Sequence, residues 1–244
     1  MMPTRTHERG FASLLLLWTA LASPAGAQEG QHATGAIHGK ISVTRRDEVR
    51  PAPLRDQMFG MYSMHGGEGA PLQPGTSPGA SARLSEKAVV YLEGEDLNRG
   101  TYPLPARAPS LDQRNLQFHP QVLAVLAGTR VEFPNRDPLF HNVFSYSQAK
   151  EFDLGRYPRD DSRSVTFDRP GVVRVYCDIH SSMSATILVL RHPYFASPDD
   201  AGAYAIGHIP PGTYRAVLWY DRDVLERKTV EVREGEDLEL DFND

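Results

Sequence analysis

Short stretches in which apolar and polar residues alternate recur along the chain, and turn-forming residues such as Gly128, Pro170-Gly171 and Pro211-Gly212 separate them. Alternation with a period of two places successive side chains on opposite faces of a strand, so each stretch predicts a half-buried β-strand. Many short strands joined by turns are typical of a β-sandwich or barrel, and we therefore predict an all-β fold. The predicted strands are residues 36–43, 88–92, 122–125, 130–133, 164–167, 172–177, 185–190, 214–219, 228–232 and 238–242.

The N-terminal residues follow a different pattern. Arg5 and Arg9 precede an apolar run over residues 11–22, and small residues follow as far as Ala27. A basic start, an apolar run too short to span a bilayer and a small-residue cleavage site are typical of a secretory signal peptide. We therefore expect residues 1–27 to be removed near Ala27, and the mature protein to be exported to the periplasm or the extracellular space.

Charge and cysteine content narrow the possible functions. The net charge is −5 at pH 7 and the sequence has no basic cluster, which argues against a nucleic-acid partner. After the N-terminal run, no apolar stretch is long enough to cross a membrane, so we expect no membrane-spanning segment. The chain has one cysteine, Cys177. Exported proteins normally pair their cysteines, so Cys177 is either an inert buried residue or part of a chemical site.

The residues around Cys177 favour the chemical site. Cys177 ends a predicted strand, and the alternation along that strand directs its sulfur toward the interior. His180 and Met183 follow at intervals of three residues, so that one tight loop can direct three side chains at a single point. A thiolate, an imidazole and a thioether form a soft set of ligands that favours copper over magnesium or calcium.

A second imidazole would complete such a site, and His141 is the candidate. It follows a predicted strand and the turn at residues 135–138. Such a turn can place His141 at one end of the sandwich, beside the Cys177 loop. Two imidazoles and a thiolate with a weak axial thioether describe a blue-copper electron-transfer site. We therefore predict one copper ion per chain, cycling between Cu(I) and Cu(II), with the ligands His141, Cys177, His180 and Met183.

Residues from about 111 to 190 resemble the amicyanin and plastocyanin branch of the cupredoxins. The resemblance implies a Greek-key β-sandwich, the same four ligand roles, and for Asn142 a hydrogen bond near the cysteine that ties the two ligand loops together. Ser181 and Ser182 depart from the pattern, because a proline or an aromatic residue often stands there, and this puts any partner taken from the family in doubt. The matching stretches are residues 118–120, 128–133, 135, 141–142, 166–167, 171 and the loop 177–183, whose short spacing is similar to that of amicyanin.

The flanking segments resemble a different β-sandwich, the transthyretin-like regulatory module of carboxypeptidases. Residues 202–217 are similar to a strand of that module that runs into a Pro-Gly turn and returns along the next strand. Residues 35–41 and 88–92 are similar to its first two strands. The resemblance implies a domain for interaction or stability, with carbohydrate or protein surfaces as its partners. No catalytic motif is visible in these segments.

These two resemblances predict a discontinuous second sandwich, made of residues 34–98 and 194–244, into which the copper-binding domain, residues 105–191, is inserted. Its first part contains a Gly- and Pro-rich stretch, residues 66–82, that predicts a flexible loop. The alternative is that the early strands extend the cupredoxin sheet and the C-terminal residues form a short β appendage.

Three methionines offer a possible accessory copper site. Met58, Met61 and Met64 recur every third residue, and His65 follows. Because thioethers are soft ligands for Cu(I), a weak second copper site is one interpretation. The other is a short amphipathic turn that packs the methionines against the core.

A one-electron carrier is the function that these features favour, with a dehydrogenase, a cytochrome or an oxidase as its redox partner. Copper handling, by a carrier or storage protein, is the alternative. A single-copper reductase needs an open coordination position, against which the axial Met183 argues, and a purely structural copper is a fourth interpretation. The sequence has no His-x-His pair and no second cysteine, which argues against multicopper oxidases and binuclear copper sites. The sequence does not indicate an oligomeric state.

Overall fold

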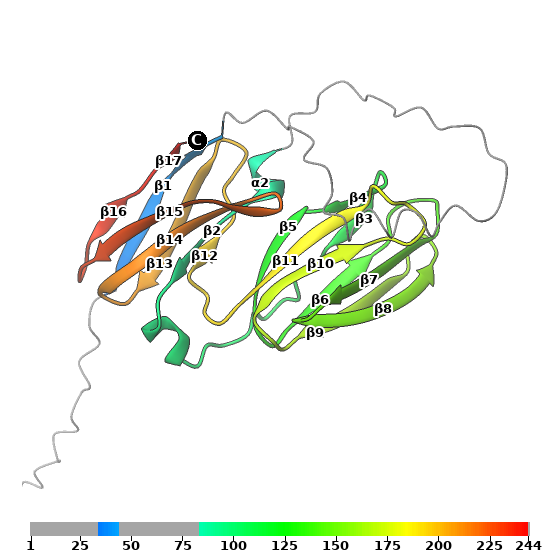
Figure 1. Ribbon diagram of the computed structural model, residues 1–244, viewed down its shortest axis with the longest axis horizontal. Helices are drawn as coiled ribbons and strands as arrows, with labels where there is room; N and C mark the ends of the chain where they lie inside the picture. The colour runs from blue at the N-terminus through cyan, green and yellow to red at the C-terminus, as the bar shows by residue number, and fades with distance from the viewer. Residues whose placement is uncertain (1–33, 44–82, 244) are drawn as a thin grey trace, which may run out of the picture. The chain divides into compact units, whose positions relative to one another are not determined.

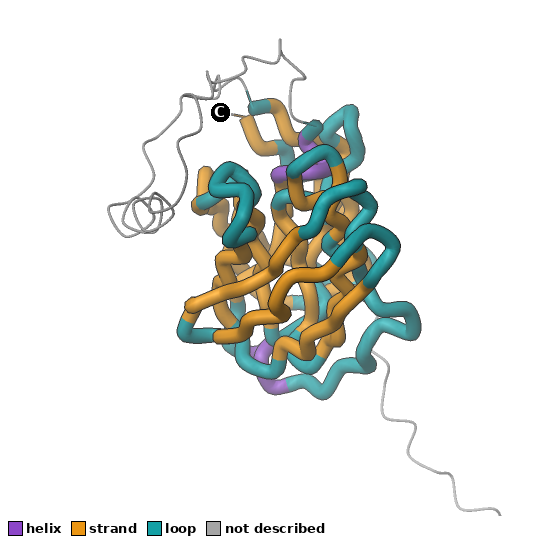
Figure 2. The backbone as a smooth tube through the Cα atoms, turned by 90° about the vertical axis from the view of Figure 1, so that its right-hand side faces the viewer, coloured by secondary structure: helices purple, strands orange, loops and turns teal. Residues whose placement is uncertain are grey.

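Strands make up most of the described chain, as the alternating pattern predicts. The computed structural model describes residues 34–43 and 83–243 (Figure 1). Within these residues, helix is confined to α2 (Leu84–Lys87) and η1 (Asp96–Arg99) (Figure 2). No helix of the described part is long and apolar enough to cross a membrane. The expected signal peptide, the Gly- and Pro-rich loop and residues 58–65 lie outside the described residues.

The middle part of the chain forms a group of sheets around one core. Five strands, in the order β5-β11-β10-β7-β8, form the largest sheet, β6 pairs with β9, and β3 pairs with β4 (Figure 1). Alternate residues point into a shared core, among them Val131 and Phe133 of β6 and Val173 and Val175 of β10. The strands are β3 (Asp112–Arg114), β4 (Gln117–His119), β5 (Val122–Leu126), β6 (Thr129–Pro134), β7 (His141–Ser147), β8 (Lys150–Tyr157), β9 (Ser162–Phe167), β10 (Gly171–Tyr176) and β11 (Ser184–Leu190).

The remaining strands form two further sheets around a second core. One sheet has the order β13-β1-β16, with β17 also paired to β1, and the other has the order β12-β2-β14-β15. Ile37, Leu92, Ile206 and Leu218 lie in the core that the two sheets share. Segments that precede and follow the middle part therefore pair with each other. The strands are β1 (Gly35–Ser42), β2 (Ala88–Glu93), β12 (Phe195–Ala196), β13 (Ala203–Ile209), β14 (Gly212–Tyr220), β15 (Asp223–Val232), β16 (Asp237–Glu239) and β17 (Phe242–Asn243).

The alternating pattern did not predict several of these strands, including β3, β4, β7 and β8, and it predicted one undivided strand where there are two. Strand β8 lies at the edge of its sheet and most of its residues are partly or fully exposed. Its sequence is correspondingly polar and contains Gly155, so the apolar alternation that marks a half-buried strand is weak. The predicted strand at residues 238–242 is instead divided into β16 and β17, which pair in turn with β1.

Candidate metal centre

The turn that begins at Asn135 places His141 at the start of β7, with the side chain of His141 fully buried. Asn135, which is also fully buried, holds this turn. Its Nδ2 donates hydrogen bonds to the carbonyl oxygens of Leu139 (2.8 Å) and Tyr157 (3.1 Å), and its Oδ1 accepts the backbone N–H of Asp137 (2.9 Å). An asparagine that satisfies the backbone groups of a turn fixes the conformation of that turn. His141 therefore enters the core in a defined direction.

The loop over residues 177–183 connects β10 to β11. The two strands pair antiparallel along their whole length, so the loop starts and ends at neighbouring positions. The backbone N–H of Cys177 donates to the carbonyl of Met183 (3.3 Å), and the N–H of Met183 donates to the carbonyl of His180 (2.9 Å). Cys177 and Met183 are buried, whereas His180 is only partly buried. The loop thus directs both sulfur-containing side chains inward and leaves part of His180 exposed.

Three potential ligand atoms converge between these two segments. Nδ1 of His141 lies 3.0 Å from Nδ1 of His180. Sγ of Cys177 lies 3.9 Å from the first nitrogen and 3.8 Å from the second. Because metal–ligand bonds to nitrogen and sulfur are about 2.0–2.3 Å long, atoms at such separations can share one ion. Met183, which belongs to the same buried core as Cys177, adds a thioether to the loop.

The chemistry of these donors fits copper. Two imidazoles and a thiolate, with a thioether as a weaker fourth ligand, form the soft and asymmetric set that copper prefers. Burial lowers the pKa of His180, and the neighbouring His141 lowers it further. The neutral imidazole, which is the form that binds metals, is favoured as a result.

Asp137 is a member of the centre that the sequence analysis missed. Its Oδ2 lies 2.8 Å from Nε2 of His141, and only 6% of the residue is exposed. Its carboxylate also accepts the backbone N–H groups of Asn115 (2.7 Å) and Leu116 (2.9 Å). Burial acts to raise the pKa of Asp137, but these hydrogen bonds outweigh it and hold the pKa below its usual value. The available signal was the acidic residue four positions before His141, within a turn.

An ion pair that was also not foreseen ties the cysteine loop to β8. Nε and one terminal nitrogen of Arg156 lie 3.1 and 3.0 Å from Oδ2 of Asp178. Arg156 stands opposite Asn142 in the pairing of β8 with β7. The ion pair therefore joins β8, which pairs with the strand of His141, to the loop that contains Cys177. Only the three-dimensional pairing shows this proximity, because nothing in the spacing of the two residues indicates it.

The described residues confirm neither the predicted role of Asn142 nor the predicted methionine site. Asn142 is buried beside His141 in β7, but its Oδ1 has no hydrogen-bond partner among the described residues. The predicted hydrogen bond of Asn142 near the cysteine stays a prediction. Met58, Met61, Met64 and His65 lie outside the described residues, so the accessory site also stays a prediction.

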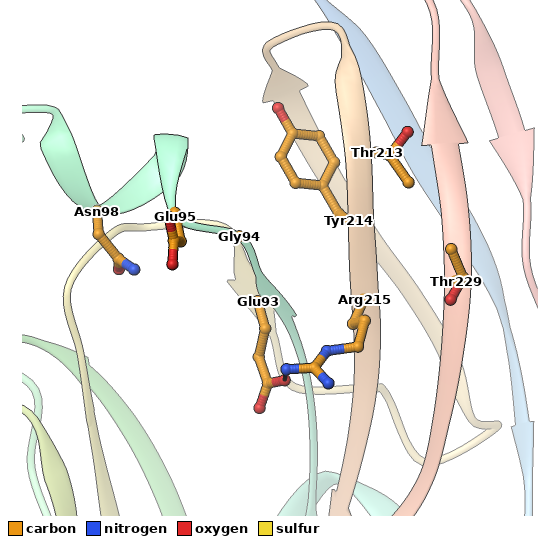
Figure 3. A pocket seen from close by; sticks show the side chains of 8 residues that line it. All are labelled: Glu93, Gly94, Glu95, Asn98, Thr213, Tyr214, Arg215 and Thr229. Carbon is orange, nitrogen blue, oxygen red and sulfur yellow. Dashed lines mark ion pairs between the residues drawn. The ribbon is translucent and has the colours of Figure 1, made fainter.

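A cavity of about 430 Å³ lies elsewhere, in the sheet that contains β2, β14 and β15 (Figure 3). Arg215 pairs there with Glu93 at 3.1 Å. Most of the residues that line it have polar side chains, and none is a cysteine or a histidine, so they do not form a copper site. They are Glu93, Gly94, Glu95, Asn98, Thr213, Tyr214, Arg215 and Thr229.

Comparison with known families decides the nature of the middle part. Its sequence matches the copper binding proteins of the plastocyanin/azurin family over residues 107–190. Residues 107–190 therefore form a cupredoxin domain, and copper is its cofactor. The predictions of an all-β cupredoxin and of a copper cofactor are confirmed.

Solved structures similar to this chain match it only in part. Amicyanin from Paracoccus versutus is 21% identical, with a TM-score of 0.33, over 36% of this chain and 85% of that protein. A purple cupredoxin from Nitrosopumilus maritimus is 25% identical, with a TM-score of 0.29, over 31% of this chain and 84% of that one. A copper-containing nitrite reductase from Thermus scotoductus is 24% identical, with a TM-score of 0.34 over 37% of this chain, and the match spans only 24% of the reductase. None of the curated proteins compared with this chain matches it.

Proposed function

We propose that this protein is an exported type 1 (blue) copper protein that carries one electron at a time. The convergence of His141, Cys177 and His180 within a plastocyanin/azurin-type domain supports this proposal. Met183 is the proposed axial ligand. When bound, copper supplies a couple between Cu(I) and Cu(II) that takes up or releases one electron.

The contribution of the protein is to hold the ligands in one arrangement. The turn before His141 is fixed by the buried side chain of Asn135, and the Cys177 loop is closed by backbone hydrogen bonds. Neither set of bonds involves the metal. The ligands therefore have little freedom to move when the charge of the ion changes, and this keeps the reorganisation that accompanies electron transfer small. Burial of Cys177 and Met183 also excludes water from the sulfur ligands.

An exposed apolar surface next to the centre supports a protein as the redox partner. Leu139 and Phe140, which directly precede His141, are 48% and 57% exposed. Ile179, which directly precedes His180, is 39% exposed. Because Nδ1 of His141 and Nδ1 of His180 lie 3.0 Å apart, these side chains belong to segments that border the same centre. Exposed apolar side chains beside a functional centre are typical of interaction sites. We propose that a dehydrogenase, a cytochrome or an oxidase binds here and exchanges electrons through His180.

The visible absorption spectrum of the Cu(II)-loaded protein tests the proposal. We expect an intense blue thiolate-to-copper band that a mild reductant bleaches reversibly. Cys177→Ser removes the thiolate and so abolishes the band. Thr129→Ser, a conservative change at a buried residue of β6 outside the centre, retains it. A wild-type protein that binds copper without this band would contradict a type 1 site.

Copper handling is the alternative function, because Met58, Met61 and Met64 have the spacing of a soft Cu(I) site. It predicts more than one Cu(I) per chain, and loss of the extra ion when all three methionines are replaced by leucine. A ratio of one copper ion per chain in the wild-type protein counts against it. The ratio is measured by metal analysis of the protein after dialysis.

A further inference from the structure

Asp137 connects two parts of the cupredoxin domain through one carboxylate. On one side its Oδ2 meets Nε2 of His141 at 2.8 Å. On the other side it accepts the backbone N–H groups of Asn115 and Leu116 at 2.7 and 2.9 Å. With 6% of the residue exposed, the carboxylate is almost completely shielded from water.

The hydrogen bond from His141 determines which ring nitrogen carries the proton. A carboxylate that receives N–H groups acts as an acceptor, so Nε2 of His141 must be the protonated nitrogen. The lone pair is then on Nδ1. This is the nitrogen that faces Sγ of Cys177 (3.9 Å) and Nδ1 of His180 (3.0 Å). Asp137 thus orients the ring and selects the tautomer that can bind the metal.

The negative charge of Asp137 acts on the metal through the same bond. A carboxylate that accepts three N–H donors is satisfied in its ionised form. In a buried environment its charge is poorly screened, and it favours the more highly charged of two metal states. Negative charge delivered through His141 therefore stabilises Cu(II) relative to Cu(I).

The turn between β3 and β4 supplies the other two donors. Asn115 and Leu116 both have positive φ angles, 55° and 57°, and form the tip of the hairpin. This conformation directs their adjacent N–H groups at Asp137. The hairpin tip therefore fixes the carboxylate, and the carboxylate in turn fixes the histidine.

We propose that Asp137 is a positioning residue that anchors His141 to the β3–β4 turn, fixes its metal-binding tautomer and lowers the reduction potential of the copper centre. The inference rests on the proposed function, since it takes His141 as a copper ligand. The lower reduction potential is expected in the copper-loaded protein at fixed pH, with the same four ligands.

The equilibrium between Cu(I) and Cu(II) in Asp137→Asn tests the effect of the charge. At fixed pH, against a redox mediator of known potential, the ratio of Cu(I) to Cu(II) is expected to rise roughly tenfold, the scale at which partners of metal ligands act. For a one-electron couple this corresponds to about 59 mV. Asp168→Asn is the matched control, because the side chain of Asp168 is 65% exposed and pairs with Lys150. Asp168 precedes β10 and Cys177 follows it, so the two residues lie at opposite ends of that strand. A change in Asp137→Asn no larger than that of the control overturns the proposal.

The tautomer of His141 is tested in the wild-type protein, which avoids any failure of the variant to fold. In ¹⁵N-labelled protein loaded with Cu(I), a slowly exchanging proton on Nε2 of His141 is expected in long-range ¹H–¹⁵N spectra. A deprotonated or rapidly exchanging Nε2 overturns the proposal. The same slowly exchanging proton on Nε2 of His141 is expected in the metal-free protein. If the wild-type protein lacks the blue band, the proposed function fails, while the spectra still decide whether Asp137 holds His141.

Discussion

At the scale of single residues, three of the buried or partly buried histidines, His141, His180 and His192, have different surroundings. His141 is hydrogen-bonded to the carboxylate of Asp137, and His180 is a partly exposed member of the metal centre. His192 lies outside the centre, with only 4% of the residue exposed and no hydrogen-bond partner for Nδ1 among the described residues. Its ring lies 5.5 Å from that of Tyr194. Burial lowers the pKa of His192, and a hydrogen bond to the backbone of Leu92 offsets part of this effect.

The lowered pKa predicts that His192 makes folding sensitive to acid. The unfolded chain takes up a proton at His192 near pH 6.5, whereas the folded chain takes it up only at a lower pH. The contribution of neutral His192 to stability is therefore complete above pH 6.5 and is lost as the pH falls through the folded-state pKa. We expect His192→Gln to reduce the loss of unfolding free energy between pH 7 and pH 5, measured by urea denaturation of the metal-free protein.

His38→Gln, at an exposed position of β1, serves as the control for this measurement. The dependence of its unfolding free energy on pH should match that of the wild-type protein. Equal pH dependence in the wild-type protein and His192→Gln would show that His192 is not the group responsible.

At the scale of elements, a buried polar cluster joins β3, β6 and β8. The hydroxyl of Tyr157, at the end of β8, donates a hydrogen bond to the carbonyl oxygen of Phe133 (2.8 Å) and accepts one from Nε2 of Gln113 (2.6 Å). All three residues are fully buried. Burial raises the pKa of Tyr157, so its hydroxyl keeps the proton that it donates. The cluster therefore fixes the positions of three strands near the turn that holds His141.

We expect Tyr157→Phe to lower the free energy of unfolding by about 1–3 kcal/mol, because it leaves buried polar groups without partners. Urea denaturation of the metal-free protein measures the change. Tyr146→Phe is the control, since Tyr146 is 52% exposed and surface changes stay within about 0.5 kcal/mol. Equal effects of the two substitutions would mean that the cluster does not stabilise the fold.

The elements also show how far the sequence could predict the site. The spacing of Cys177, His180 and Met183 is local, and a single loop bears all three, so the pattern was readable from the sequence. His141 could be found because it follows a recognisable turn. Asp137 and Arg156 could not be assigned, because their roles depend on a hairpin tip and on the register of β8 against β7. Strand β8 itself was missed because an exposed edge strand lacks strong apolar alternation.

At the scale of the whole molecule, the outer sheets depend on strands from both ends of the described chain. Strand β1 pairs with β13 on one side and with β16 and β17 on the other. It also places Ile37 and Ile41 in the core. Alternation shows which residues form strands but does not show which strands pair. The pairing could be expected only from the resemblance of the flanking segments to a transthyretin-like module, and that resemblance stays a prediction.

Removal of β1 tests the importance of this arrangement. In a chain that begins at residue 83, we expect the amides of β13 and β16 to lose their protection from hydrogen exchange, because their partner strand and two buried isoleucines are missing. A buried isoleucine contributes about 1.5–3 kcal/mol. Strands β10 and β11 should keep their protection. A chain that begins at residue 34 is the control, and strong protection of β13 without β1 would contradict the prediction.

The pairing of β12 with β2 also bears on the order of folding. Phe195 and Ala196 stand opposite Tyr91 and Val90, so the chain enters and leaves the cupredoxin domain at neighbouring strands. While that domain is unfolded, pairing of β2 with β14 requires closure of a long flexible loop, and the entropic penalty grows with loop length. Once the domain has folded, its ends are held close together and little loop remains to be closed. Long-range pairing is slow in general, so we expect the copper-binding domain to fold before the outer strands pair.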